Sequence, residues 1–300
     1  MWLRVMVPLV AVLVSGCANY RAVSAFGGDT TSMTTVVKSE FDQIETLCVR
    51  QAELAIVVSN IGNDGPIDQC ARNRRAQGLF AALTVEVLDG YAQGLSALAD
   101  DQPFDLSPDV KSVGGKVRAL KDNAGNALVS TREADALSSV ATILVDVLAS
   151  AKRDEAVRQM VAATPDLTIV GQSLRAFFVQ APGAPSNAPK APYTNLVAVI
   201  SSSASSTQPI LESTPMRKAE PIRTAELLRE LRTRQKLLAR RAPDAPNSVP
   251  ASVVAAIDAW LVALQKFSTD ALKPDSRELI DRLKTLRTEI RKARDAVADK

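Results

Sequence analysis

The sequence contains no histidine among its 300 residues, and this absence excludes several kinds of active site. Ser-His-Asp and Cys-His catalysis both need an imidazole as the general base. Histidine is also the commonest protein ligand of zinc and copper, and the three cysteines are not spaced as metal ligands. Carboxylate pairs such as Asp100–Asp101 occur, but no sequence feature selects one as catalytic. We therefore expect no catalytic residue, no metal site, no cofactor and no enzymatic activity.

Aromatic residues are scarce at 4%, and alanine and leucine dominate the apolar residues. Strands favour aromatic and β-branched residues, whereas alanine and leucine are strong helix formers. The composition therefore predicts an all-α fold. Apolar residues recur at spacings of three and four, which predicts an elongated bundle of about six to eight helices with coiled-coil-like hairpins and an irregular Pro-rich middle.

The chain also lacks a strong charge bias, with 36 basic residues against 33 acidic ones. A net charge of +3 provides no overall attraction to nucleic acid, so we predict no nucleic-acid partner.

The N-terminal apolar run is short and has the features of a secretory signal. Arg4 precedes ten residues from Val5 to Val14, and the small residues Ser15 and Gly16 follow. A membrane-spanning helix needs about 20 apolar residues, so this run predicts a signal peptide rather than a membrane span.

The residues Val14-Ser15-Gly16-Cys17 resemble the lipobox of bacterial lipoproteins. The resemblance implies that residues 1–16 are cleaved and that Cys17 becomes an acylated N-terminus that anchors the protein to a membrane. Ala18 is not aspartate, which in this class implies the periplasmic leaflet of the outer membrane rather than the inner membrane. The alternative is a soluble secreted protein that is cut near Gly16, with Cys17 incidental.

The other two cysteines, Cys48 and Cys70, face an oxidising compartment if the protein is exported. Because Cys17 is reserved for lipid, they form the one remaining pair, and we predict a disulfide between them. The alternative is two buried free thiols that act as small apolar side chains.

We expect a flexible tether at 17–32, because this segment is polar and contains Gly, Ser and Thr, followed by a helical domain at 33–300. A Pro-rich segment near 181–192 interrupts the helices. Ser130 and Glu133 form a capping-box pattern at the start of one helix. The helices are expected over 33–58, 67–99, 110–128, 130–164, 166–178, part of 193–212, 216–241, 251–272 and 275–298.

The segment 217–241 combines an apolar face with nine Lys or Arg residues. In an anchored envelope protein such a helix is suited to contact an anionic lipid or cell-wall polymer. The alternative is an ordinary solvated helix face. The candidate contact residues are Arg229, Arg232, Arg234, Lys236, Arg240 and Arg241.

Two functions are consistent with these features. The first is a non-enzymatic scaffold, adaptor or assembly factor that is anchored in the bacterial envelope and binds another envelope protein. The second is an envelope module that binds a ligand, the cell wall or anionic lipid through 217–241. No feature of the sequence sets the oligomeric state.

Overall fold

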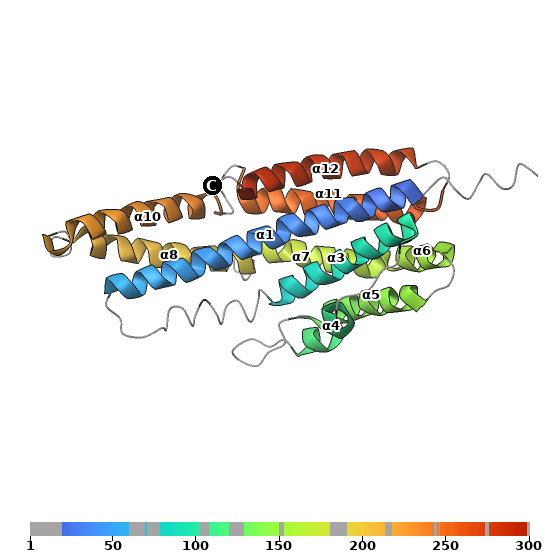
Figure 1. Cartoon of the computed structure of the whole chain (residues 1–300), viewed down its shortest axis with the longest axis horizontal. Coiled ribbons are helices and arrows are strands. Elements are labelled where there is room, and N and C mark those ends of the chain that lie inside the picture. The colour runs from blue at the N-terminus through green and yellow to red at the C-terminus, as the bar shows by residue number, and fades with distance from the viewer. Residues whose placement is uncertain are drawn as a thin grey trace, which may run out of the picture.

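The computed structural model is all-helical and elongated (Figure 1). Its described parts contain ten α-helices and no strand. An all-α bundle is therefore confirmed, whereas the expected six to eight helices are too few for these parts alone. The structure describes residues 20–59, 70, 79–102, 108–119, 129–149, 153–180, 191–213, 218–242, 245, 247–273 and 276–298.

Helix α1 (Tyr20–Ser59) has 40 residues and extends through most of the molecule (Figure 1). At 1.5 Å per residue it is about 60 Å long. The helix starts at Tyr20, so the prediction of a flexible tether was wrong for residues 20–32. Residues 17–19 lie outside the described part.

The segment that we expected to be a tether folds because its apolar residues form one inward face. Ala22, Val23 and Phe26 are buried, and the Phe26 ring stacks on Phe267 with their centroids 4.5 Å apart. The polar residues also fit a helix: Thr30 donates to the carbonyl oxygen of Phe26, one turn earlier. Such bonds satisfy hydroxyl groups inside a helix, so a high Ser and Thr content does not require a loop.

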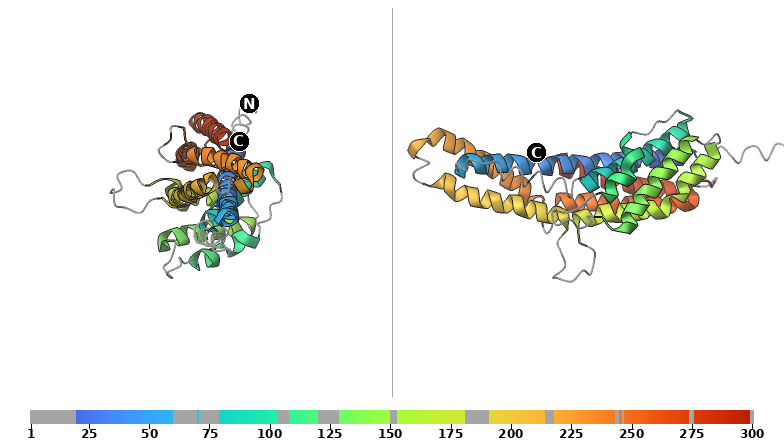
Figure 2. Two further views of the ribbon diagram at one scale, coloured as in Figure 1. Left: turned by 90° about the vertical axis from the view of Figure 1, so that its left-hand side faces the viewer. Right: turned by 90° about the horizontal axis from the view of Figure 1, so that it is seen from below.

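One end of the molecule is a thick body that surrounds the N-terminal half of α1 (Figures 1 and 2). Helices α3, α11 and α12 contact α1 directly, and α7 packs between α11 and α5. The buried Trp260 of α11 donates from Nε1 to Thr30 of α1 at 2.9 Å. The body helices are α3 (Leu79–Asp100), α4 (Pro108–Arg118), α5 (Thr131–Ala149), α6 (Arg153–Ala162), α7 (Thr164–Phe178), α11 (Val249–Asp270) and α12 (Arg277–Ala298).

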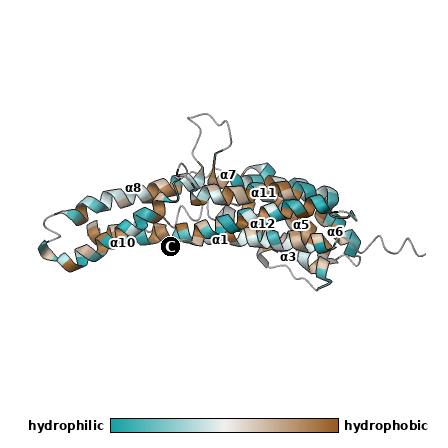
Figure 3. Cartoon of the chain, turned by 90° about the horizontal axis from the view of Figure 1, so that it is seen from above, coloured by the Kyte–Doolittle hydropathy of each residue, from teal (hydrophilic) through white to brown (hydrophobic). Residues whose placement is uncertain are grey.

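Helix α11 is long and apolar enough to cross a membrane by length and composition alone. It contacts α12, α7, α1 and α6, so in this fold it is a core helix of the body. The helices carry apolar residues along their length beside hydrophilic ones (Figure 3), as expected when one face packs inward.

The other end is a thin arm of three helices. It consists of the C-terminal half of α1 together with α8 (Pro192–Glu212) and α10 (Pro221–Ala239). Helix α8 packs between the other two, since it contacts both α1 and α10. The helix expected within 193–212 is thus present. Residues 181–190 of the Pro-rich interruption lie outside the described part, and Pro192 is the first residue of α8.

The capping box at the start of α5 is also present. The backbone N–H of Ser130 donates to Glu133 at 2.9 Å, and the backbone N–H of Glu133 donates to the Ser130 hydroxyl at 3.3 Å. The single helix expected over 130–164 is two helices, α5 and α6. Helix α7 then starts at Thr164 with Pro165 in its first turn, a position where proline costs no helical hydrogen bond.

Candidate functional site

A buried ion pair lies where the arm joins the body. The guanidinium of Arg241, just after α10, donates through Nε and Nη2 to the two carboxylate oxygens of Glu40 on α1, at 2.8 and 2.9 Å. Glu40 is 0% exposed and Arg241 2% exposed. The hydroxyl of the buried Tyr193, at the start of α8, donates to the same carboxylate at 2.6 Å. The group therefore connects all three helices of the arm.

This polar junction extends to the end of α12. The Gln43 side chain accepts from Arg241 at 2.7 Å and donates to the carbonyl oxygen of Val297 at 3.1 Å. Arg240 donates to the carbonyl oxygen of Ala296 at 3.1 Å. These donors satisfy carbonyls in the last turn of α12, which have no partner within the helix. The polar junction thus fixes the arm to the C-terminal end of the body.

Burial and hydrogen bonding set the protonation of the polar junction. Burial raises the pKa of the Glu40 carboxyl, and the hydrogen bonds and positive charge of Arg241 oppose this rise. Burial and the neighbouring Glu40 carboxylate hold the pKa of Tyr193 well above its ordinary value. Tyr193 therefore remains a protonated donor at neutral pH. The polar junction thus joins side chains of α1 and α8 to the residue that follows α10.

The structure corrects two of the six predicted anionic-surface contacts. Arg241 is buried and its guanidinium binds Glu40 in the polar junction, and Arg234 is only 7% exposed. Arg234 donates to the carbonyl oxygen of Arg50 on α1 and to Glu230 on its own helix. Both arginines therefore point inward and fasten this segment to α1. Arg234 lies on the same face of α10 as the buried Leu231 and Leu238, and Arg241 follows the end of that helix.

Three of the other four predicted contacts lie on the outside of the arm. Arg229, Arg232 and Lys236 are exposed, and none has an ion-pair partner among the residues that the structure describes. Arg240 is half-buried at the polar junction. We call Arg229, Arg232 and Lys236 the cationic strip.

The outward face of α1 in the arm has the opposite character. A shallow, open groove of about 450 Å³ lies along it and includes three carboxylates and one guanidinium. Its described lining residues are Asp42, Glu45, Thr46, Val49, Arg50 and Glu53.

The third outward face of the arm, on α8, is almost uncharged. Its 21 residues include a single charged side chain, Glu212. Exposed positions on this helix carry small or apolar residues, such as Ala198, Val199 and Ser205. The arm therefore presents three chemically different faces: acidic on α1, basic on α10 and neutral on α8.

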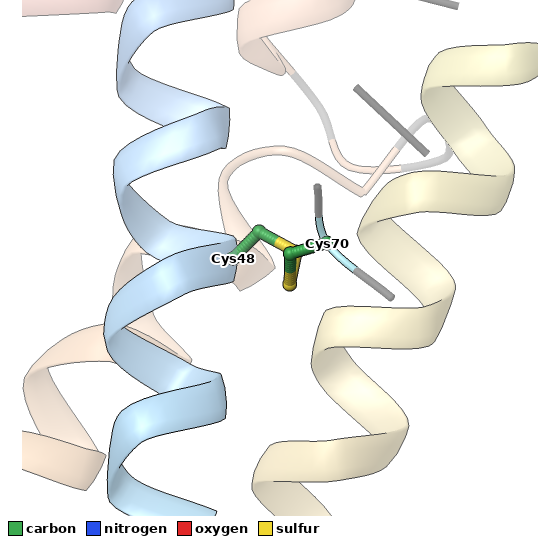
Figure 4. Close-up of a disulfide and its surroundings, with 2 residues drawn as sticks. All are labelled: Cys48 and Cys70. Atoms are coloured by element: carbon green, nitrogen blue, oxygen red, sulfur yellow. A yellow bond between two sulfur atoms is a disulfide. The ribbon is translucent and has the colours of Figure 1, made fainter. Parts of the chain in front are cut away.

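The predicted disulfide is present in the arm. The sulfur atoms of Cys48 and Cys70 are 2.00 Å apart, and their Cα atoms are 5.9 Å apart. Cys48 lies on α1 and is buried, and the bond lies on the side of α1 that faces α8 (Figure 4). The bond ties residue 70 back to α1 across 22 positions of sequence.

The remaining predicted site residue, Cys17, lies outside the described residues. No group of three or more Cys, Asp or Glu side chains in the described part could hold a metal ion.

Sequence reasoning missed Glu40 and Tyr193, because a single carboxylate and a single phenol carry no pattern. The face of α10 that holds Arg234 and Arg241 was readable, since Thr224, Leu231 and Leu238 recur on it every seven residues.

Comparisons with protein-family models, with curated proteins and with solved structures found no match to this chain. The fold therefore defines only a structural class, an elongated helical bundle with a three-helix arm.

Proposed function

We propose that this protein is a bacterial envelope lipoprotein, anchored through acylated Cys17, that acts as a non-enzymatic scaffold or adaptor. The observation that supports it best is the start of α1 at Tyr20, with only Ala18 and Asn19 between it and Cys17. Two or more acyl chains on one cysteine suffice for a stable membrane anchor. Because α1 runs unbroken from Tyr20 into the arm, a single helix leads from a point three residues after Cys17 to the arm.

A short connection has a mechanical consequence. A flexible tether of about 15 residues would let the bundle move well away from the membrane, whereas the three residue steps from Cys17 to Tyr20 span at most about 11 Å and keep the start of α1 close to it. The arm is then presented at a set distance from the anchor, which is what a spacer or adaptor requires. By resemblance to other lipoproteins, the site of action is the periplasmic leaflet of the outer membrane, and the partner is another envelope protein.

The anchor is tested by Cys17→Ser in the full-length chain, with Cys70→Ser as the matched control. Membrane fractions and incorporation of labelled palmitate are compared with those of the unmodified protein. We expect Cys17→Ser to lose the label and to leave the membrane fraction as an uncleaved or soluble chain, while Cys70→Ser retains both. Unchanged labelling and pelleting of Cys17→Ser would refute the anchor.

The scaffold role is tested by photo-crosslinking in cells. A crosslinking residue is placed at Ile222, which is 77% exposed at the start of α10, or at Val145 on the body. We expect a discrete crosslinked envelope protein from position 222 and none of the same mass from position 145. Equal or absent crosslinking at both positions would contradict an adaptor role for the arm.

A further inference from the structure

The cationic strip is a continuous positive surface rather than a scatter of charges. Arg229, Arg232 and Lys236 follow one another at spacings of three and four, so at about 100° per residue they fall within roughly 60° of arc on α10. Arg234, whose guanidinium donates to the carbonyl oxygen of Arg50 on α1, lies on nearly the opposite side of α10, and Glu230 binds it there. Glu226 is exposed and flanks the strip, about 60° from Arg229. The strip therefore faces away from α1 and contains no carboxylate.

Asp42 and Glu53 are the exposed carboxylates of the groove on α1, which also includes Glu45 and Arg50. They are eleven residues apart and fall within roughly 20° of arc, with Thr46 and Val49 between them. Neither has an ion-pair partner within the described part of the chain. This face points away from α8, because Gln51, which donates to Thr207 of α8, lies on the opposite side of α1. We call Asp42 and Glu53 the acidic pair.

Two contacts within one molecule set the heights of these surfaces along the arm. Arg234 contacts the carbonyl oxygen of Arg50, and Arg241 contacts Glu40, so α1 and α10 run antiparallel. At 1.5 Å per residue, Glu53 lies at the height of Arg229 and Arg232, to within about one helical turn. Asp42 lies about one turn beyond Lys236, close to the polar junction.

We propose that neighbouring copies of this chain associate side by side, with the cationic strip of one copy against the acidic pair of the next. The two surfaces lie on different sides of the arm, so the contact is head-to-tail rather than two-fold symmetric. Contacts of this type extend into rows or close into rings. Two copies standing in parallel bring Glu53 to the height of Arg229 and Arg232, and Asp42 to within about one helical turn of Lys236.

The equal height depends on the proposed anchoring at Cys17, which places all copies in one membrane. Exposed ion pairs contribute only about 0–1 kcal/mol each, so the contact is weak between free molecules. Confinement in a membrane raises the effective concentration and favours association. The arm therefore provides both the spacing and the lateral contact of a scaffold.

A second copy fits the strip better than an anionic lipid surface does. The strip lies at the height of residues 46–53 of α1, so at 1.5 Å per residue it is about 40–50 Å from the start of α1. Electrostatic attraction to a charged surface is screened within about 8 Å at physiological ionic strength. The strip of an upright molecule is thus beyond the reach of its own membrane, whereas the acidic pair of a neighbour is not.

Cysteine crosslinking in membranes tests the contact. We place Glu53→Cys and Arg232→Cys together in the full-length chain, in which Cys48 and Cys70 are already bonded to each other. A head-to-tail contact predicts a ladder of dimers, trimers and larger species from the doubly substituted chain. Each single substitution should remain monomeric, because its partner position is not a cysteine. Absence of the ladder, or equal dimerisation of one single variant, would overturn the proposal.

Charge reversal separates a second copy from an anionic polymer as the occupant of the strip. The crosslink is now formed between Arg229→Cys and Val49→Cys. We expect the pair Arg232→Glu and Lys236→Glu, or the pair Asp42→Lys and Glu53→Lys, to reduce this crosslink about tenfold. All four changes in one chain should restore it. If the chain with all four changes does not recover, the proposal fails. Salt-sensitive binding of the unmodified chain to anionic vesicles or cell-wall polymer, with no recovery in that variant, would assign the strip to an anionic polymer instead.

The anchor and the contact can fail separately. The same charge variants in the Cys17→Ser chain, concentrated at low salt, report the contact without the membrane, whereas palmitate labelling reports the anchor alone. Salt-dependent association of the Cys17→Ser chain that follows the charge pattern would support the contact even if labelling disproves the anchor. If the Cys17→Ser chain does not associate and no ladder of crosslinked species forms in membranes, the contact is overturned, whereas the anchor is not.

Discussion

Arg241 and Glu40 show how much one residue pair controls in this fold. Both are fully enclosed, and the guanidinium satisfies both carboxylate oxygens while it also donates to Gln43 and to the carbonyl oxygen of Leu237. A buried ion pair is often no better for stability than an apolar pair of similar volume, but removal of one partner leaves a buried charge without compensation. The polar junction therefore specifies how the arm meets the body more than it adds net stability.

This asymmetry gives a prediction at the residue scale. We expect Arg241→Met and Glu40→Leu each to lower the free energy of unfolding by about 3–5 kcal/mol, and the double variant to lose clearly less than the sum. The measurement is the urea unfolding midpoint of each chain. The control Arg232→Met, on the exposed side of α10, should change the free energy by less than about 0.5 kcal/mol. Additive losses in the double variant would show that the pair is not coupled.

Glu133 ties two helices together and makes stability depend on pH. It accepts from Ser130 in the capping box and from the Ser173 hydroxyl of α7 at 2.6 Å. Burial acts to raise the pKa of Glu133, but the hydrogen bonds from Ser173 and Ser130 outweigh it and leave the pKa below its ordinary value. The folded state therefore favours the carboxylate form of Glu133.

A lowered pKa fixes the sign of the pH effect. The stabilisation by Glu133 is present above the pKa of the unfolded chain, about 4.5, and is lost as the pH falls through the lower folded value. We expect Glu133→Gln to lower the free energy of unfolding at pH 7 by about 1 kcal/mol. Below about pH 4, the free energies of unfolding of the variant and of the unmodified chain should become more similar. Thermal unfolding at several pH values measures this. A difference that stays constant down to about pH 3 would contradict the assignment.

At the scale of helices, the periodicity of apolar residues predicted most elements but not the extent of α1. Helix α8 was predictable although six of the seven residues 201–207 are Ser or Thr, which are weaker helix formers, because a loop of that length is uncommon in a compact domain. The first turns of α1 were missed because Gly27 and Gly28 suggested flexibility. In the folded protein, Gly27 instead lets α3 approach closely, a reason that depends on a partner helix distant in sequence.

Substitution of these two adjacent glycines by alanine should have opposite effects on stability, so each variant is the control for the other. A Cβ on Gly27 would lie 2.5 Å from the Ser96 hydroxyl and 2.7 Å from the carbonyl oxygen of Ala92, whereas a Cβ on Gly28 would meet nothing within 4 Å. We expect Gly27→Ala to destabilise the protein by about 1–3 kcal/mol, because α1 and α3 must move apart. Gly28→Ala should stabilise it by up to about 1 kcal/mol through helix propensity. Thermal unfolding of both variants checks this, and equal shifts would show that α3 does not approach α1 at Gly27.

At the scale of the whole molecule, the site was less predictable than the fold. Sequence position alone placed Arg229 and Arg234 on one basic helix, but only packing against α1 separates the exposed Arg229 from the enclosed Arg234. The sequence around the acidic pair does not indicate a contact surface, because the proposed contact depends on the height of the pair relative to α10. Such relations arise from how the three arm helices pack, so the sequence pattern of one helix does not contain them.

The continuity of α1 is the property on which the proposed height of the arm above a membrane depends. Spin labels at Arg21→Cys and Val57→Cys occupy exposed positions in its first and last turns, 36 residues apart. A straight helix predicts a single distance of about 54 Å between their Cα atoms, measurable by pulsed electron paramagnetic resonance. Lys38→Pro, at an exposed position near the polar junction, removes a helical hydrogen bond and should broaden or shorten the distribution, whereas Lys38→Ala should not. A broad or much shorter distance in the chain without a change at position 38 would mean that α1 bends between residues 21 and 57, and the proposed set height of the arm above a membrane would be contradicted.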